Sequence, residues 1–127
     1  MRSRHIYLAS TWENRYELRP VRDELERRGH VVTSTWIDVG AVDYPREIGA
    51  KRDYDDLVIR ACTLVLWPDD LRKKTTGKYV EFGMAIGAGL EIFIVQPETS
   101  SCIFVSLQKP WIHRVASFEE LYTALEQ

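Results

Sequence analysis

The sequence predicts an α/β fold in which one domain, residues 1–127, forms a three-layer sandwich around a mainly parallel five-stranded sheet. Two observations support this prediction. Short apolar segments rich in strand-forming residues alternate with longer segments of helical periodicity, an order that is typical of parallel sheets covered by helices. Hydrophobic residues make up 45% of the 127 residues, which is enough for one core without disulfides.

Five short segments have the composition of buried strands. They are rich in Val, Ile, Leu and aromatic residues and are bounded by polar or glycine-containing stretches. The expected strands comprise residues 6–9, 31–36, 64–67, 91–95 and 111–115. A further apolar stretch at 103–105 is expected to form a short strand or a turn.

Four segments have the pattern of helices. The expected helices follow the first strand, span residues 52–62 and 79–88, and begin at Ser117. Pro20 is expected in the first turn of the first helix, because a proline deeper inside would break it. Ser117 and Glu120 have the spacing of a capping box. The helix at 79–88 is apolar almost all round, so we expect both of its sides to be covered. The polar segment 38–51 is long for a loop, which indicates a functional loop or a short extra helix.

Strand order then predicts where a ligand binds. In a flavodoxin-like or Rossmann-like sheet, ligands bind beyond the carboxyl ends of the strands, at the point where the strand order reverses. In the flavodoxin-like order that point lies between the first and third strands, which end at Ala9–Ser10 and Pro68–Asp69. Polar loops begin at both places, so we expect one cleft there.

The composition excludes several function classes. A formal net charge of −2 argues against a general binder of polymeric nucleic acid or of membranes. No apolar run reaches the roughly 20 residues that a membrane helix needs. Cys62 and Cys102 lack metal-binding spacing, and we expect two buried thiols in a reducing, cytoplasmic protein. We expect no metal and no redox cofactor.

Glu81 is the strongest candidate for chemistry. It lies in a helix that is otherwise nearly free of charge, with Met84, Ala85 and Ala88 on its face. Small side chains there would let a ligand approach the carboxylate, and the nearby helix start favours an ionised group. An ionised, partly desolvated carboxylate can attack an electrophilic sugar carbon. The alternative is a capping or ion-paired glutamate.

Two aspartates are further candidates. On a helical wheel Asp55 falls inside the apolar arc of residues 54–62, whereas Asp53 and Asp56 fall on the solvated side. An inward aspartate contacts either the backbone or a ligand. Asp69 follows the third strand, where an aspartate also serves as a turn former.

Polar residues in the flanking loops are candidates for substrate binding. Trp12 could stack on a base, and Arg15 or Arg19 could hold a phosphate or a sugar hydroxyl. The loop before the helix at 79–88 offers hydroxyls and free amides that can hold an anion, although a solvated loop explains it equally well. The full set of binding candidates is Tyr7, Ser10, Trp12, Arg15, Arg19, Thr75, Thr76 and Gly77.

These segments together resemble the nucleoside 2-deoxyribosyltransferase superfamily, which includes deoxyribonucleoside 5′-monophosphate N-glycosidases. The resemblance rests on the stretches HIYLAS, GHVVTSTWID, DDLVIRACTLVLW, TTGKYVEFGMAIGAG and SFEELYTAL. It implies that Glu81 is the nucleophile, that Asp55 assists the leaving base, and that Tyr7 lies near the sugar. It also implies a 5′-phosphate site at residues 75–77 in phosphate-using members, an additional acidic residue at Asp69, and a homodimer or larger homo-oligomer.

The resulting expectation is cleavage or transfer at the N-glycosidic bond of a (deoxy)nucleoside or nucleoside 5′-monophosphate through a glycosyl-enzyme. Two alternatives remain. One is a nucleotide-binding sensor or scaffold that has the fold but no turnover. The other is a flavodoxin-like binder of a different phosphorylated ligand, which would depend on residues 75–77 and not on Glu81.

Overall fold

The computed structural model describes residues 3–39 and 45–127. Its elements follow in the order β1 (His5–Ala9), α1 (Arg15–Arg27), β2 (Val31–Val32), α2 (Arg46–Tyr54), β3 (Thr63–Leu66), α3 (Gly77–Ala88), β4 (Glu91–Val95), β5 (Ile112–Val115) and α4 (Phe118–Leu125). The five strands are all parallel, in the order β2-β1-β3-β4-β5. This confirms the predicted α/β class, a five-stranded sheet in a flavodoxin- or Rossmann-like sandwich.

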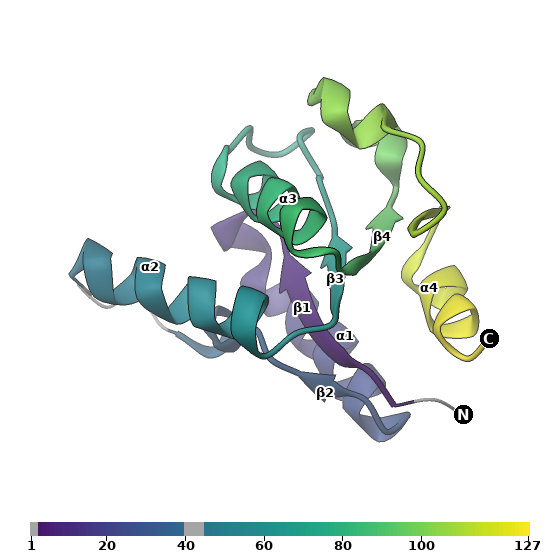
Figure 1. Ribbon diagram of the computed structural model, residues 1–127, viewed down its shortest axis with the longest axis horizontal. Coiled ribbons are helices and arrows are strands. Elements are labelled where there is room, and N and C mark those ends of the chain that lie inside the picture. Colours follow the sequence, from purple (N-terminus) through teal and green to yellow (C-terminus); the bar gives the residue numbers. More distant parts are fainter. Residues whose placement is uncertain (1–2, 40–44) are drawn as a thin grey trace.

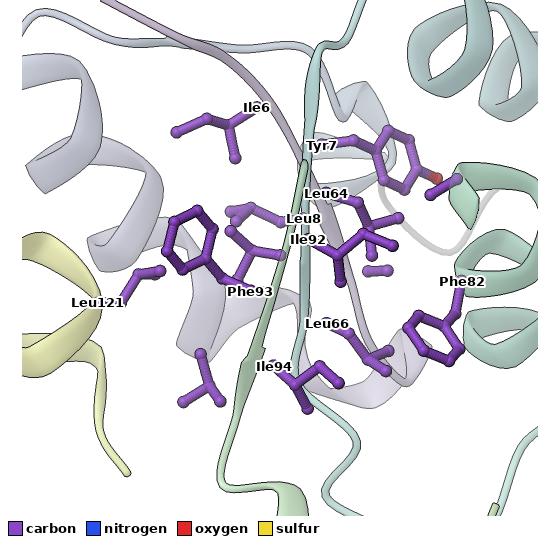
Figure 2. Close-up of a cluster of buried hydrophobic side chains, with 14 of the residues drawn as sticks. Ile6, Tyr7, Leu8, Leu64, Leu66, Phe82, Ile92, Phe93, Ile94 and Leu121 are labelled. Atoms are coloured by element: carbon purple, nitrogen blue, oxygen red, sulfur yellow. The ribbon is translucent and has the colours of Figure 1, made fainter. Parts of the chain in front are cut away.

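Helices cover both faces of the sheet, with α3 on one face and α1 and α4 on the other (Figure 1). Tyr7, Leu64 and Ile92 are register partners on adjacent strands and point toward α3. Ile6 and Phe93 point the opposite way, as Figure 2 shows. The alternation of strand side chains therefore brings the Tyr7 hydroxyl to the α3 face.

The second strand is shorter than the sequence predicts. Only Val31–Val32 forms β2, and Thr35–Asp38 forms a 3₁₀ turn instead of continuing the strand to residue 36. The backbone N–H of Leu8 donates to the Ser34 hydroxyl oxygen at 3.0 Å. A side chain thus takes the place of a backbone acceptor there, which ends the ladder.

Two expectations about helices are also wrong. Pro20 is the sixth residue of α1 and not part of its first turn, because α1 begins at Arg15. The helix continues through it and lacks the bond that an N–H at residue 20 would donate to Tyr16. One side of α3 is uncovered in the described chain, since Val80 is 59% exposed. Ser117 caps α4 as expected, because the Glu120 N–H donates to Ser117 Oγ at 3.1 Å, but the Glu120 carboxylate accepts from the Ala116 N–H at 2.8 Å and so completes the box one residue early.

The remaining expectations concern the apolar stretch at 103–105, the polar segment 38–51 and the cysteines. The apolar stretch is a turn, part of the 3₁₀ helix Ile103–Ser106. The polar segment does contain a helix, because α2 begins at Arg46, but residues 40–44 lie outside the described chain. Cys62 is exposed and Cys102 is partly exposed, so the prediction of two buried thiols is wrong.

In the described part of the chain, no helix combines the length and apolar character needed to cross a bilayer.

Candidate functional site

A pocket of about 230 Å³ opens at the carboxyl end of β1, where the strand order reverses, and the loop between β3 and α3 contributes Thr75 to its lining. The predicted cleft therefore exists at the predicted edge of the sheet. Its walls come from the β1 end, the 3₁₀ turn Thr35–Asp38, α2 and the start of α3. The lining residues are Ser10, Trp12, Trp36, Arg52, Asp53, Thr75, Gly77, Lys78 and Glu81.

Glu81 is largely buried in this pocket and accepts a hydrogen bond at Oε2 from the Tyr7 hydroxyl. Tyr7 reaches it because strand alternation directs this side chain toward α3. Both residues are candidates from the sequence, and the fold brings them into direct contact. The pair forms although 74 residues separate its members in the chain.

The pKa of Glu81 is raised to about 8: burial is the largest cause, the negative charge of Asp53 adds to the shift, and the Tyr7 hydrogen bond opposes it. The sequence analysis expected an ionised carboxylate near the helix start. The raised pKa runs against that expectation, because Glu81 is the fifth residue of α3 and burial is the largest cause of the shift. Burial, with the Glu81 charge, also raises the pKa of Tyr7 well above its usual range, so Tyr7 remains a donor.

Asp53, and not Asp55, is the second carboxylate of the pocket. Asp55 faces away and accepts from Lys51 Nζ at 2.5 Å. The prediction that Asp55 points inward and Asp53 outward is wrong. The reason is that α2 begins at Arg46 and then widens into a π-helical turn, Asp55–Ile59, to which a wheel of 100° per residue does not apply.

The π-helical turn also buries Asp56, which is only 2% exposed and was expected on the surface. Its Oδ2 accepts from the N–H and the hydroxyl of Thr35 at 3.2 and 2.6 Å. Its Oδ1 is paired with Arg60 at 3.2 Å. Conversely, Tyr54 and Ile59, which the wheel assigned to the buried arc, are 48% and 69% exposed. Asp56 thus ties the π-helical turn to the pocket wall that carries Trp36.

Burial raises the pKa of Asp53, and the adjacent Arg52 opposes this shift. The Arg52 guanidinium donates to Asp53 Oδ1 through Nε at 3.1 Å and Nη2 at 3.0 Å. Two carboxylates with raised pKa values, Asp53 and Glu81, therefore line one small pocket. Such pairs are typical of acid–base chemistry.

Asp69 does not line the pocket. Its Oδ2 accepts from Asn14 Nδ2 at 3.2 Å and lies 3.5 Å from Arg72 Nε. Its backbone has a φ of 33°, the left-handed conformation that aspartate tolerates in turns. This geometry agrees with the turn-forming alternative that the sequence left open.

Lys78 and Asp70 form a buried ion pair that the sequence analysis missed. The two side chains meet at 2.9 Å, and Lys78 is 1% exposed. Burial alone would raise the pKa of Asp70. Three partners outweigh this effect and hold the pKa well below its usual range: the hydrogen bonds from Tyr79 and Ser101, and the pairing with Lys78. One signal was available: a lysine in the first turn of a helix opposes the helix dipole and so needs a nearby carboxylate.

Two tryptophans form the aromatic wall of the pocket. The rings of Trp12 and Trp36 lie 6.2 Å apart at 35°. Trp36 is fixed by a hydrogen bond from its Nε1 to the Leu8 carbonyl at 2.9 Å. The sequence analysis named Trp12 but assigned Trp36 to a strand. A planar aromatic ligand could pack against this wall.

Four of the eight named binding candidates, Tyr7 among them, are absent from the pocket lining. The Arg15 guanidinium packs over the Trp12 ring at 4.2 Å. Arg19 donates to the Ile37 carbonyl at 3.2 Å. Thr76 precedes α3 and lines a separate apolar groove of about 520 Å³ beside Phe104. Ser10, Trp12, Thr75 and Gly77 do line the pocket as expected, and Tyr7 reaches it through Glu81.

Within residues 3–39 and 45–127, no group of three or more His, Cys, Asp and Glu side chains has the geometry of a metal site. Comparison of the chain with models of protein families, with characterised proteins and with solved structures found no match. Any assignment of function therefore depends on the residues of the pocket.

Proposed function

We propose that this protein cleaves or transfers at the N-glycosidic bond of a (deoxy)nucleoside or nucleoside 5′-monophosphate, with Glu81 as the nucleophile. One observation carries the proposal: a largely buried glutamate faces a small open pocket, held by the Tyr7 hydroxyl. In the described ranges the groups that shift its pKa include no lysine or arginine. The proposal includes membership of the nucleoside 2-deoxyribosyltransferase superfamily, which the sequence resembles.

In the first step a Glu81 carboxylate oxygen forms a bond to C1′ of the sugar, and the bond from C1′ to the base nitrogen breaks. The electron pair leaves with the base, which takes a proton from Asp53. Asp53 replaces Asp55 in this role because it lines the pocket beside Glu81. The negative carboxylate stabilises the oxocarbenium-like transition state.

In the second step a water oxygen, or the nitrogen of a second base, attacks C1′ and displaces Glu81. The incoming nucleophile loses its proton to the Asp53 carboxylate, which restores the starting state. Tyr7 orients the Glu81 carboxylate during both steps, and Trp12 and Trp36 offer a surface on which the base stacks.

The raised pKa of Glu81 fits this scheme if Glu81 and Asp53 share one proton near neutral pH. Two nearby carboxylates seldom ionise together in a desolvated site. The reactive form has the proton on Asp53 and the charge on Glu81. This arrangement supplies the nucleophile and the acid at the same time.

The test is release of free base from a panel of nucleosides and their 5′-monophosphates, measured for the wild type and for Glu81→Gln. We expect Glu81→Gln to lose at least about a hundredfold in rate, because an amide cannot form the glycosyl ester. Glu98→Gln, at an exposed position in the 3₁₀ helix Pro97–Thr99, is the matched control and should keep full activity. Full activity in Glu81→Gln would overturn the mechanism.

A nucleotide-binding sensor without turnover is the second candidate. The observation in its favour is that a Glu81 pKa of about 8 leaves the carboxylate mostly protonated at pH 7. The sensor predicts saturable nucleoside binding without base release, and binding that survives Glu81→Ala. Calorimetric titration of that variant, run beside the release assay, separates the two candidates.

We also propose that the protein forms a homodimer or a larger homo-oligomer. Phe104 and Trp111 are 62% and 41% exposed, so core packing does not explain these aromatic residues. Phe104 and the exposed Val80 lie at the apolar groove beside α3. Light scattering after size exclusion should give at least twice the mass of one chain, and Phe104→Ser should lower it.

A further inference from the structure

The charge balance of the pocket bears on which substrate it accepts. Two cationic side chains, Lys78 and Arg52, line its described part. Each is already paired with a carboxylate: Lys78 with Asp70 at 2.9 Å and Arg52 with Asp53 at 3.0 Å. Glu81 adds a further acidic group to the lining. The described lining therefore has no excess of positive charge to offset a dianion.

The ammonium group of Lys78 is also saturated with hydrogen bonds. Its Nζ lies 2.9 Å from Asp70 Oδ1, 3.1 Å from Thr11 Oγ1, 3.1 Å from Thr75 Oγ1 and 3.3 Å from the Thr75 carbonyl. Thr11 Oγ1, Thr75 Oγ1 and the Thr75 carbonyl accept hydrogen bonds and occupy the three N–H donors of the lysine, and Asp70 is its ion-pair partner. A phosphate could bind Lys78 only by displacing one of these buried partners.

The basic loop before α3 offers no better anion site. Arg72 is paired with Glu17 and Asp69, and Lys73 is paired with Glu13 at 2.7 Å. Together with Lys74, these are the residues whose charge, judged from the sequence, could attract a phosphate at residues 75–77. In the folded chain the charges of Arg72 and Lys73 are offset by neighbouring carboxylates, and the exposed Lys74 is not among the residues that line the pocket.

We propose that the pocket selects an uncharged nucleoside with a free 5′-hydroxyl and discriminates against the 5′-monophosphate. The chemistry of the substrate rests on the function proposed above; the selection rests on the charges and hydrogen bonds of Lys78, Arg52 and Asp70. Ser10 and Thr75 supply neutral hydroxyls suited to a sugar hydroxyl. The volume of about 230 Å³ also favours the smaller ligand, because pockets for drug-sized ligands start at roughly 300 Å³.

The first experiment measures binding, so that it does not depend on turnover. The four 2′-deoxynucleosides and their 5′-monophosphates are titrated by calorimetry into the wild type and into Glu81→Gln. We expect the preferred nucleoside to bind at least about tenfold more tightly than its monophosphate, since unpaired or like charges are strongly disfavoured in a desolvated site. Equal or tighter binding of the monophosphate, or no binding of any nucleoside, would overturn the inference.

The failures of the two proposals are distinguishable. Base release from monophosphates with no preference for nucleosides would sustain the proposed reaction and remove this inference. Tight nucleoside binding without release would remove the proposed reaction and support the inference.

The second experiment removes the negative charge of Asp70, the ion-pair partner of Lys78. Asp70→Asn should shift the ratio of monophosphate to nucleoside affinity by about tenfold in favour of the monophosphate, because the Lys78 charge is no longer offset. Asp23→Asn is the matched control, because it removes the same charge from an exposed residue of α1 that pairs with Arg22 and lies outside the pocket lining. It should leave the ratio unchanged. Thermal melting checks that each variant folds, and an unchanged ratio in folded Asp70→Asn would contradict the proposed cause. If Asp70→Asn does not fold, the wild-type titration decides.

Discussion

The Tyr7 hydroxyl on β1 donates its hydrogen bond to the Glu81 carboxylate on α3, so an inner strand of the sheet orients the proposed nucleophile. Both groups have raised pKa values, and burial is the largest cause in each case. Tyr7 therefore stays protonated in the neutral pH range, and as a hydrogen-bond donor it favours the ionised form of Glu81.

This relationship predicts a bell-shaped pH dependence of kcat/KM for base release, with its alkaline limb near pH 8. The reactive form carries one proton on the pair of Glu81 and Asp53, and above pH 8 that proton is lost. Tyr7→Phe removes the donor that lowers the pKa of Glu81. The alkaline limb should then move to higher pH while the maximum rate falls, because the proton shifts from Asp53 to Glu81. Tyr16→Phe, an exposed control, should leave both features unchanged. A profile of Tyr7→Phe that overlays the wild type would contradict this reasoning.

The same shift in the pKa of Glu81 predicts how protein stability depends on pH. The folded value of about 8 lies above the unfolded value of 4.5, so this group's stabilising contribution is full below pH 4.5 and is lost as pH rises through 8. Glu81→Gln cannot ionise. Its free energy of unfolding relative to the wild type should therefore increase between pH 5 and pH 9, by at most about 5 kcal/mol. Urea denaturation at several pH values measures the difference. A constant difference across that range would show that Glu81 ionises without cost in the folded protein.

The sequence could predict the edge of the sheet and much of the pocket, because both follow from local patterns. Tyr7 reaches Glu81 through strand alternation. Ser10 and Thr75 lie where loops leave or approach the carboxyl edge of a parallel sheet. These positions depend only on the order of elements and on periodicity.

The remaining site residues depend on features without a local signal. Asp53 faces the pocket because the following turn is π-helical, and a regular wheel gives the wrong face. Trp36 joins the pocket because β2 ends early, where Ser34 replaces a backbone acceptor. The position of Lys78 in the first turn of a helix indicates that it needs an acidic partner. The sequence does not indicate that this partner is Asp70, because loop geometry decides whether Asp69 or Asp70 faces Lys78.

Substitution of Asp56 tests how much the hydrogen bonds of the π-helical turn contribute to the free energy of unfolding. The buried carboxylate of Asp56 accepts from the Thr35 N–H and hydroxyl and is paired with Arg60. Asp56→Ala leaves these donors without a partner, so we expect a loss of about 2–4 kcal/mol in the free energy of unfolding. Asp55→Ala removes the same group one residue earlier, where the partner Lys51 is 77% exposed and the pair should contribute less than about 1 kcal/mol. Urea denaturation of both variants provides the measurement. Equal losses would mean that Asp55 and Asp56 are equivalent in solution, contrary to the geometry of this turn.

Substitutions at Asp53 and Asp55 test which of the two carboxylates protonates the leaving base in the proposed reaction. Asp53→Asn keeps the shape of the side chain but removes the acid that protonates the leaving base. We therefore expect kcat for base release to fall by about 10²–10⁴-fold, the usual contribution of general acid–base catalysis. Asp55→Asn should keep kcat within about twofold, because Asp55 contacts Lys51 outside the pocket. The result for Asp53→Asn should also depend on the leaving group: a base that needs no protonation should depart from this variant at nearly the wild-type rate. Rates with nucleosides of graded leaving ability supply that measurement. If Asp55→Asn were instead the inactive variant, the regular helical wheel would describe the working enzyme better than the π-helical turn does.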